Sequence, residues 1–112
     1  MEIINVRINN ATVVLDDRDR LSARMNFEAE RGCVSWEFIL TNSIDVQRLV
    51  KLMNYAGAYY VEGLDGKIVR IVNCASSLRG FGDPIKEKFI PTFGEQLKEL
   101  TITEFEELLK TK

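Results

Sequence analysis

A basic, glycine-containing segment is the first place in this 112-residue sequence where residue types and spacing suggest chemistry. Arg79-Gly80-Phe81-Gly82 sets an aromatic residue between two glycines, and Lys86 and Lys88 follow soon after. Glycines allow a close approach to the backbone, and the three cations suit a phosphate or acidic side chains. The spacing is not that of a Walker or dinucleotide-binding loop. The alternative is structural: a glycine-marked bulge in a strand, with the lysines protecting a sheet edge.

A second candidate site is aromatic. Tyr59 and Tyr60, with neighbouring arginines and lysines, can stack single-stranded bases or a nucleotide. Successive residues of a strand point to opposite faces, so we expect only one of these two tyrosines to be exposed. Periodicity assigns Phe27, Trp36 and Phe38 to the core. The alternative is a set of core aromatics with one surface tyrosine.

The acidic end of the chain is a third candidate. Residues 94–112 contain five glutamates and three lysines, which account for the whole formal charge of −2. Glu104, Glu106 and Glu107 fall on a predicted amphipathic helix, where they can imitate a nucleic-acid backbone or meet a basic partner surface. The alternative is the solvated face of a docked helix. The chain has no basic excess of the kind that drives non-specific nucleic-acid binding.

Several kinds of catalysis are excluded by composition. The sequence contains no histidine, which removes Ser-His-Asp and Cys-His catalysis and Cys₂His₂ zinc sites. The aspartates of segment 16–20 alternate like ligands of a hard cation, but two arginines lie among them and the EF-hand pattern is missing. Cys33 and Cys74 form no C-x-x-C motif, and we expect two reduced, largely buried thiols. We therefore predict no catalytic residue, no metal and no cofactor.

Alternating apolar and polar residues predict most of the strands. A turn at Asn9-Asn10 separates predicted strands at 4–8 and 11–15, and a hairpin closed by Arg31-Gly32 joins 21–29 to 33–40. Strand-forming residues return at 59–61, at 67–73 after an Asp65-Gly66 turn, and at 78–81. Residues 85–90 are either an edge strand or one helical turn, and Pro91 ends them.

Two regions have helical spacing. Asn42 or Ser43 can cap a helix at about 44–55 that ends before Gly57. Its apolar stripe, expected to lie on the sheet, consists of Val46, Leu49, Val50 and Met53. Near the end of the chain, Phe93, Leu97 and Leu100 are helically spaced, and Thr103-x-x-Glu106 matches a capping box. One or two short terminal helices are predicted there.

These elements predict an α+β fold: a curved antiparallel sheet of about six to seven strands packed on the 44–55 helix, with a C-terminal helical segment. We expect one domain over 1–112, with the sheet-plus-helix core in 1–93 and the acidic helical segment in 94–112. No signal-peptide pattern and no apolar run of about 20 residues is present. A cytoplasmic protein without membrane association is expected.

The segment Leu64-Asp65-Gly66-Lys67-Ile68-Val69-Arg70, followed by Arg79-x-x-Gly82-x-Pro84-Ile85-Lys86-x-Lys88-Phe89, resembles small uncharacterised proteins encoded by bacteriophages and prophages. In those proteins a helix, a G-K hairpin and a G-x-P-I-K-x-K-[WF] run occur in the same order. The resemblance covers about residues 40–93, and Phe89-Ile90 stands where such proteins carry a Trp-Phe pair. Proteins of this type are similar in kind to anti-CRISPR and other anti-defence inhibitors, which occupy a surface of a host protein.

The leading hypothesis is a non-enzymatic, phage-type binding protein that blocks a host protein, either a CRISPR effector or another defence protein. Its candidate binding residues are Arg79, Phe81, Lys86, Lys88, Tyr59, Tyr60, Glu104, Glu106 and Glu107. The alternative is a single-stranded nucleic-acid or nucleotide binder, and a third hypothesis is a metal-dependent enzyme built on carboxylates. An exposed edge strand would favour a homodimer by sheet pairing.

Overall fold

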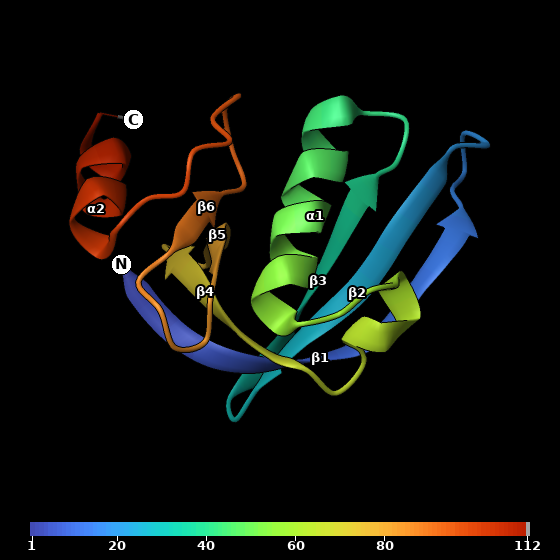
Figure 1. Cartoon of the computed structure of the whole chain (residues 1–112), viewed down its shortest axis with the longest axis horizontal. Coiled ribbons are helices and arrows are strands. Elements are labelled where there is room, and N and C mark those ends of the chain that lie inside the picture. The colour runs from blue at the N-terminus through green and yellow to red at the C-terminus, as the bar shows by residue number, and fades with distance from the viewer. Residues whose placement is uncertain (112) are drawn as a thin grey trace.

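The computed structural model describes residues 1–111 and has an α+β fold, as predicted. Six antiparallel strands curl around one helix as a half-barrel, and a second helix packs outside it beside the last strand (Figure 1). The strands are β1 (Glu2–Leu15), β2 (Leu21–Ala29), β3 (Gly32–Ile39), β4 (Ile68–Cys74), β5 (Ser77–Gly82) and β6 (Phe89–Pro91). The helices are α1 (Ser43–Ala56), a 3₁₀ helix (Val61–Leu64) and α2 (Ile102–Lys110). The strand order is β3-β2-β1-β4-β5-β6.

The β2–β3 hairpin is built as its alternation predicts. Ala23, Met25 and Phe27 are buried on the inner face of β2, and Phe38 is buried on the same face of β3. Their polar neighbours point to the outer face, which explains why the period of two is so regular here.

The predicted turn at Asn9-Asn10 is wrong, because β1 runs through it as one strand of 14 residues. The register against β2 shifts between Asn9 and Thr12, and Asn10 has a φ of 57°. Asparagine tolerates this left-handed conformation, so the extra residue is absorbed in a bulge instead of reversing the chain. Ala11, inside the bulge, is buried in the core, as is Ile8 before it.

Helix α1 begins and ends at the predicted signals. The Asn42 side chain accepts hydrogen bonds from the backbone N–H groups of residues 44 and 45, and Gly57 ends the helix in the left-handed conformation. The predicted apolar stripe is rotated, however: Val50 is 50% exposed, whereas Arg48 and Tyr55 are buried. The cause is the chain after β6, which covers that side of α1. Arg48 donates from Nη2 to the carbonyls of Phe93 and Gly94 in this segment, at 2.9 and 2.8 Å.

The predicted strand at 59–61 is also wrong, since the chain there leads into the 3₁₀ helix. The Gly66 N–H donates to the Ile8 carbonyl at 2.7 Å, and Asp65 Oδ1 accepts the Ala11 N–H at 2.6 Å. The Asp65-Gly66 turn therefore connects the 3₁₀ helix to β4 and completes hydrogen bonds of β1. It does not close a β-hairpin.

A second, smaller core lies on the outer face of the sheet, under α2. It consists of Val72, Phe89, Leu100 and Phe105. In β5 these rings meet glycines: a Cβ on Gly80 would lie 2.6 Å from the Phe105 ring, and one on Gly82 would lie 2.3 Å from the Phe89 ring. The two glycines therefore make room for aromatic packing. The register of β5 against β4 also shifts between Gly80 and Leu78, which is the bulge of the structural alternative.

The predicted helix through Phe93, Leu97 and Leu100 is absent. Leu100 instead exchanges backbone hydrogen bonds with Phe89 at 2.9 and 2.7 Å, which extends β6 by a bridge. The capping box lies two residues before the predicted one, at Thr101 and Glu104, so α2 begins at Ile102. Of residues 85–90, only the last two belong to β6.

The glycine packing predicts a selective effect of adding one methyl group. Gly80→Ala should lower the free energy of unfolding by about 1–3 kcal/mol, because its Cβ would overlap the Phe105 ring and push α2 off the sheet. Urea denaturation measures the change. Gly63→Ala is the control, since its Cβ meets only the ring of the exposed Tyr60, at 3.2 Å. Equal effects of the two substitutions would contradict this account of the second core.

Candidate binding site

Two of the predicted basic residues enter one polar pocket. Lys86 and Lys88, from the segment between β5 and β6, line it together with side chains of α1 and of the chain before α2. The pocket has a volume of about 240 Å³. Its lining residues, called here the lysine pocket, are Lys51, Asn54, Tyr55, Asp83, Lys86, Lys88 and Glu99. Three parts of the chain that lie far apart in sequence therefore meet at this site.

Hydrogen bonds of Arg70 and Asp83 fix the backbone near Lys86 and Lys88. Arg70 donates from Nε to the Asp83 carbonyl at 2.6 Å and from Nη2 to the Lys86 carbonyl at 2.5 Å. Asp83 Oδ1 accepts the N–H groups of Ile85 and Lys86 at 2.9 and 2.8 Å. Burial favours the neutral acid, but these N–H groups prevail and lower the pKa of Asp83 below its ordinary value. The segment is thus ordered while its lysine side chains stay exposed.

Glu99 is the second carboxylate of the pocket. The Tyr55 hydroxyl donates to Glu99 Oε2 at 2.8 Å, and Lys51 Nζ lies 3.3 Å from Oε1. The hydrogen bond from Tyr55 is the main cause that lowers the pKa of Glu99. Burial, followed by the same hydrogen bond, raises the pKa of Tyr55 above its ordinary range. At neutral pH the pair is therefore a carboxylate and a neutral phenol.

The pocket carries surplus positive charge. Three lysines face two carboxylates, and both carboxylates already accept hydrogen bonds within the pocket. Among residues 1–111, neither Lys86 nor Lys88 lies within ion-pair distance of an acidic group. Two ammonium groups are therefore available to an anionic group of a ligand, either a carboxylate or a phosphate.

Arg79 and Phe81 do not join this pocket. Phe81 is fully buried, with its ring 5.3, 5.8 and 5.5 Å from those of Phe27, Trp36 and Phe38. Because this ring is buried, it cannot contact a partner, and the prediction of Phe81 as a binding residue is wrong. Arg79 is exposed, but its guanidinium lies over Phe93, 5.6 Å from the ring centroid.

Both tyrosines of the second candidate site are exposed, against the expectation for a strand. Tyr59 is 97% and Tyr60 is 65% exposed. Because the chain bends here and does not form a strand, adjacent side chains need not point to opposite faces. Among residues 1–111, few apolar or aromatic side chains are as exposed as Tyr59.

The acidic candidates have different positions on α2. Glu104 is occupied in the capping box: its Oε1 accepts the Thr101 N–H at 2.9 Å, which is the main cause of its lowered pKa. Glu107 lies 3.8 Å from Lys110 in the next turn. Glu106 is exposed beside the shallow pocket lined by Met1 and Cys74. These three carboxylates do not line the lysine pocket, whereas Glu99 of the same acidic tail does.

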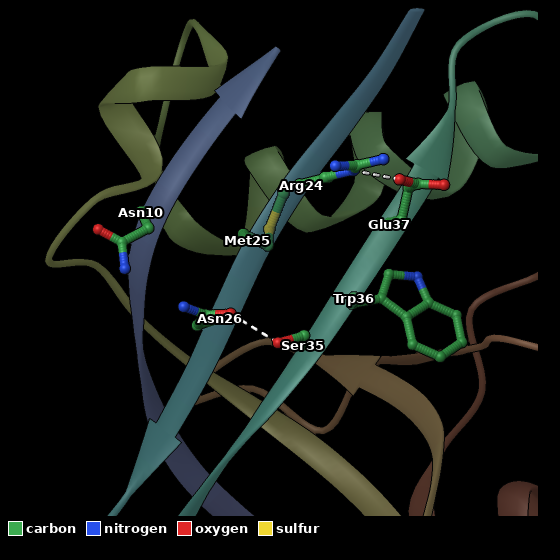
Figure 2. Close-up of a pocket in the computed structure, with 7 residues that line it drawn as sticks. All are labelled: Asn10, Arg24, Met25, Asn26, Ser35, Trp36 and Glu37. Atoms are coloured by element: carbon green, nitrogen blue, oxygen red, sulfur yellow. Dashed lines mark hydrogen bonds and ion pairs between the residues drawn. The ribbon is translucent and has the colours of Figure 1, made fainter. Parts of the chain in front are cut away.

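A second hollow lies at the strands of the β2–β3 hairpin, with a volume of about 400 Å³. Figure 2 shows its side chains spread along β1, β2 and β3. Ser35 donates to Asn26 at 2.8 Å, and Arg24 pairs with Glu37. Because four of these polar side chains are already paired with one another across the strands, they are less available to a ligand than Lys86 and Lys88, which have no ion pair within residues 1–111.

Of the aspartates in segment 16–20, Asp16 holds the loop between β1 and β2 by its side-chain hydrogen bonds. Asp16 accepts the N–H groups of Arg18 and Arg20 at 2.8 and 2.9 Å, and the Arg20 backbone bond is the largest cause of its lowered pKa. Within residues 1–111, no group of three or more Cys, Asp or Glu is arranged to hold a metal ion. Both cysteines are free thiols, but Cys33 is exposed and not buried as predicted.

Comparisons with protein-family models, with curated proteins and with solved structures found no match to this chain. Within the described residues, no helix has the length and apolar character needed to cross a membrane.

The sequence did not single out Lys51, Asn54 or Asp83 as residues of a site, and it did not connect Tyr55 of the aromatic set with Glu99 of the acidic tail. Lys51 and Tyr55 are one helical turn apart, so the period of an α-helix predicts that they lie on the same side of α1. No local signal connects Glu99 to them, because the hydrogen bond to Tyr55 spans 44 residues.

The link between Tyr55 and Glu99 predicts a pH-dependent effect. A carboxyl whose pKa is lowered by folding adds stability above its unfolded pKa of about 4.3 and loses it as the pH falls through the folded value. Tyr55→Phe should therefore lower the free energy of unfolding by about 1–2 kcal/mol at pH 7, and by less below about pH 4. Thermal unfolding at both pH values tests this, with the exposed Tyr60→Phe as control. A penalty independent of pH would count against the assignment.

Proposed function

We propose that this chain is a non-enzymatic binding protein that covers a surface of a host protein, as phage-encoded inhibitors of defence complexes do. The single observation that carries the proposal is the lysine pocket, which Lys86 and Lys88 both line, and neither lysine has an ion pair among residues 1–111. The resemblance of segment 64–89 to phage proteins supports the same class of function, because both lysines belong to the resembling run.

The chemistry of the pocket suits an acidic side chain of the partner. An isolated surface ion pair contributes only about 0–1 kcal/mol, so a single exposed lysine would add little. Here one carboxylate entering the pocket would meet two unpaired ammonium groups, with Lys51 close by. Because Arg70 and Asp83 already order the backbone of the segment, less conformational entropy is lost on binding.

Charge reversal in the pocket tests this proposal. The double substitution Lys86→Glu and Lys88→Glu should abolish retention of a protein partner from nuclease-treated bacterial host lysate, measured by affinity capture and mass spectrometry. Lys67→Glu is the control, because Lys67 is also an exposed lysine and lies outside the pocket. Melting temperatures of the three proteins should agree closely.

A partner retained by the wild type and by Lys67→Glu, but lost from the double variant, would support the pocket. A partner retained equally by all three proteins would exclude the pocket as the contact surface. Recovery that disappears after nuclease treatment would contradict protein blockade itself.

A second candidate function, binding of single-stranded nucleic acid, is favoured by the exposure of both Tyr59 and Tyr60. Exposed aromatic rings can stack bases, with a contribution of about 1–3 kcal/mol for each base. Under this function, Tyr59→Ala should weaken binding of a labelled oligothymidine about tenfold or more, and affinity should fall steeply with salt. Fluorescence anisotropy measures both effects, with Tyr55→Phe as a buried-tyrosine control. Undetectable or salt-independent binding would exclude this function.

A further inference from the structure

Strand β3 ends the sheet without a partner on its outer side. It pairs with β2 along all of its eight residues, and no strand of residues 1–111 follows it in the sheet order. The opposite edge is protected: β6 has only three residues, and Leu100 takes up backbone hydrogen bonds of Phe89 there. The two edges of the half-barrel are therefore not equivalent.

The hydrogen-bond phase of β3 identifies which backbone groups are unpaired. Leu40 donates its N–H to Leu21 of β2, whereas the N–H of Ile39 points away and is accepted by Asp45 Oδ2 at 2.8 Å. Backbone groups alternate along an antiparallel strand, and the register from Gly32 to Ile39 has no bulge. The N–H and C=O groups of Cys33, Ser35 and Glu37 therefore point to the open edge.

This edge lacks the usual obstacles to pairing. Natural edge strands are blocked by proline, by lysine, by bulges or by short length. Strand β3 has neither proline nor lysine, and its one charged residue, Glu37, is already paired with Arg24 on β2. Cys33 and Ser35 are exposed on its outer face.

We propose that two copies of this chain pair through the β3 edges, antiparallel, as a two-fold dimer with one continuous sheet. The residues with outward-pointing backbone groups, Cys33 to Glu37, form a window centred on Ser35. If all of these groups are paired, Ser35 lies opposite Ser35 of the second copy, and Cys33 lies opposite Glu37 of the second copy. This proposal is independent of the lysine pocket and of what that pocket binds.

The side chains of the window complement themselves under this symmetry. On the inner face, half-buried Trp36 comes opposite half-buried Val34 of the second copy, an aromatic pair with a β-branched residue. So short a window forms a small interface, of the class that associates transiently.

Proximity at the two-fold axis is the direct test. Residues opposite each other in a hydrogen-bonded pair lie about 5.5 Å apart. Ser35→Cys in a Cys33→Ser background should therefore give a covalent dimer with a short bifunctional maleimide. Glu28→Cys in the same background should not, because it lies on the outer face of β2, away from the edge. Equal cross-linking of the two variants would overturn the proposed register.

Sedimentation velocity over a range of concentrations tests whether the edge itself carries the dimer. The wild type should dimerise as concentration rises, and Ser35→Pro should remain monomeric, because proline removes the outward N–H at the axis. Asn26→Ala is the matched control, since it deletes the same Ser35–Asn26 hydrogen bond without blocking the edge. If Ser35→Pro unfolds, Ser35→Lys replaces it by opposing two like charges. A wild type that is monomeric throughout, or a blocked variant that still dimerises, would refute the proposal.

Discussion

Strand β5 packs against buried side chains on both of its faces, and it contributes to both cores of the molecule. On the inner face, Phe81 contacts three aromatic rings from β2 and β3 and so joins the two ends of the curled sheet. On the outer face, Gly80 and Gly82 leave the space that Phe105 and Phe89 occupy. One short strand therefore positions both the helix-covered core and the second core under α2, and side chains on its outer face would separate the latter from the sheet.

The lysine pocket is a consequence of this arrangement. Because β5 and β6 are held together by the second core, the segment between them must turn back tightly, and Arg70 and Asp83 fix that turn. The chain after β6 then covers one side of α1, where Arg48 binds its carbonyls and Tyr55 binds Glu99. The basic side chains thus stand on an ordered backbone at a junction of three segments, which is a suitable arrangement for recognising an anionic group.

The two surfaces proposed for binding differ in physical character. The lysine pocket offers charge on ordered backbone, and recognition there depends on ion pairs with a partner. The β3 edge offers unpaired backbone groups, and recognition there depends on hydrogen bonds that any extended strand of suitable register can supply. Self-complementary side chains around Ser35 are what direct that edge to a second copy of the chain. Both surfaces remain exposed in the same molecule.

Elements with local sequence signals could be predicted before the fold was known. The alternation in β2 and β3, the caps of α1 and the α+β class follow from period and capping chemistry within a few residues. Other features were visible only in the folded chain: Asn10 forms a bulge, Leu100 bridges β6 and does not continue a helix, Phe81 is buried, and Glu99 contacts Lys51 and Tyr55. Each of these depends on contacts between residues far apart in the chain, and a local pattern contains no information about which distant side chain will fill a given space.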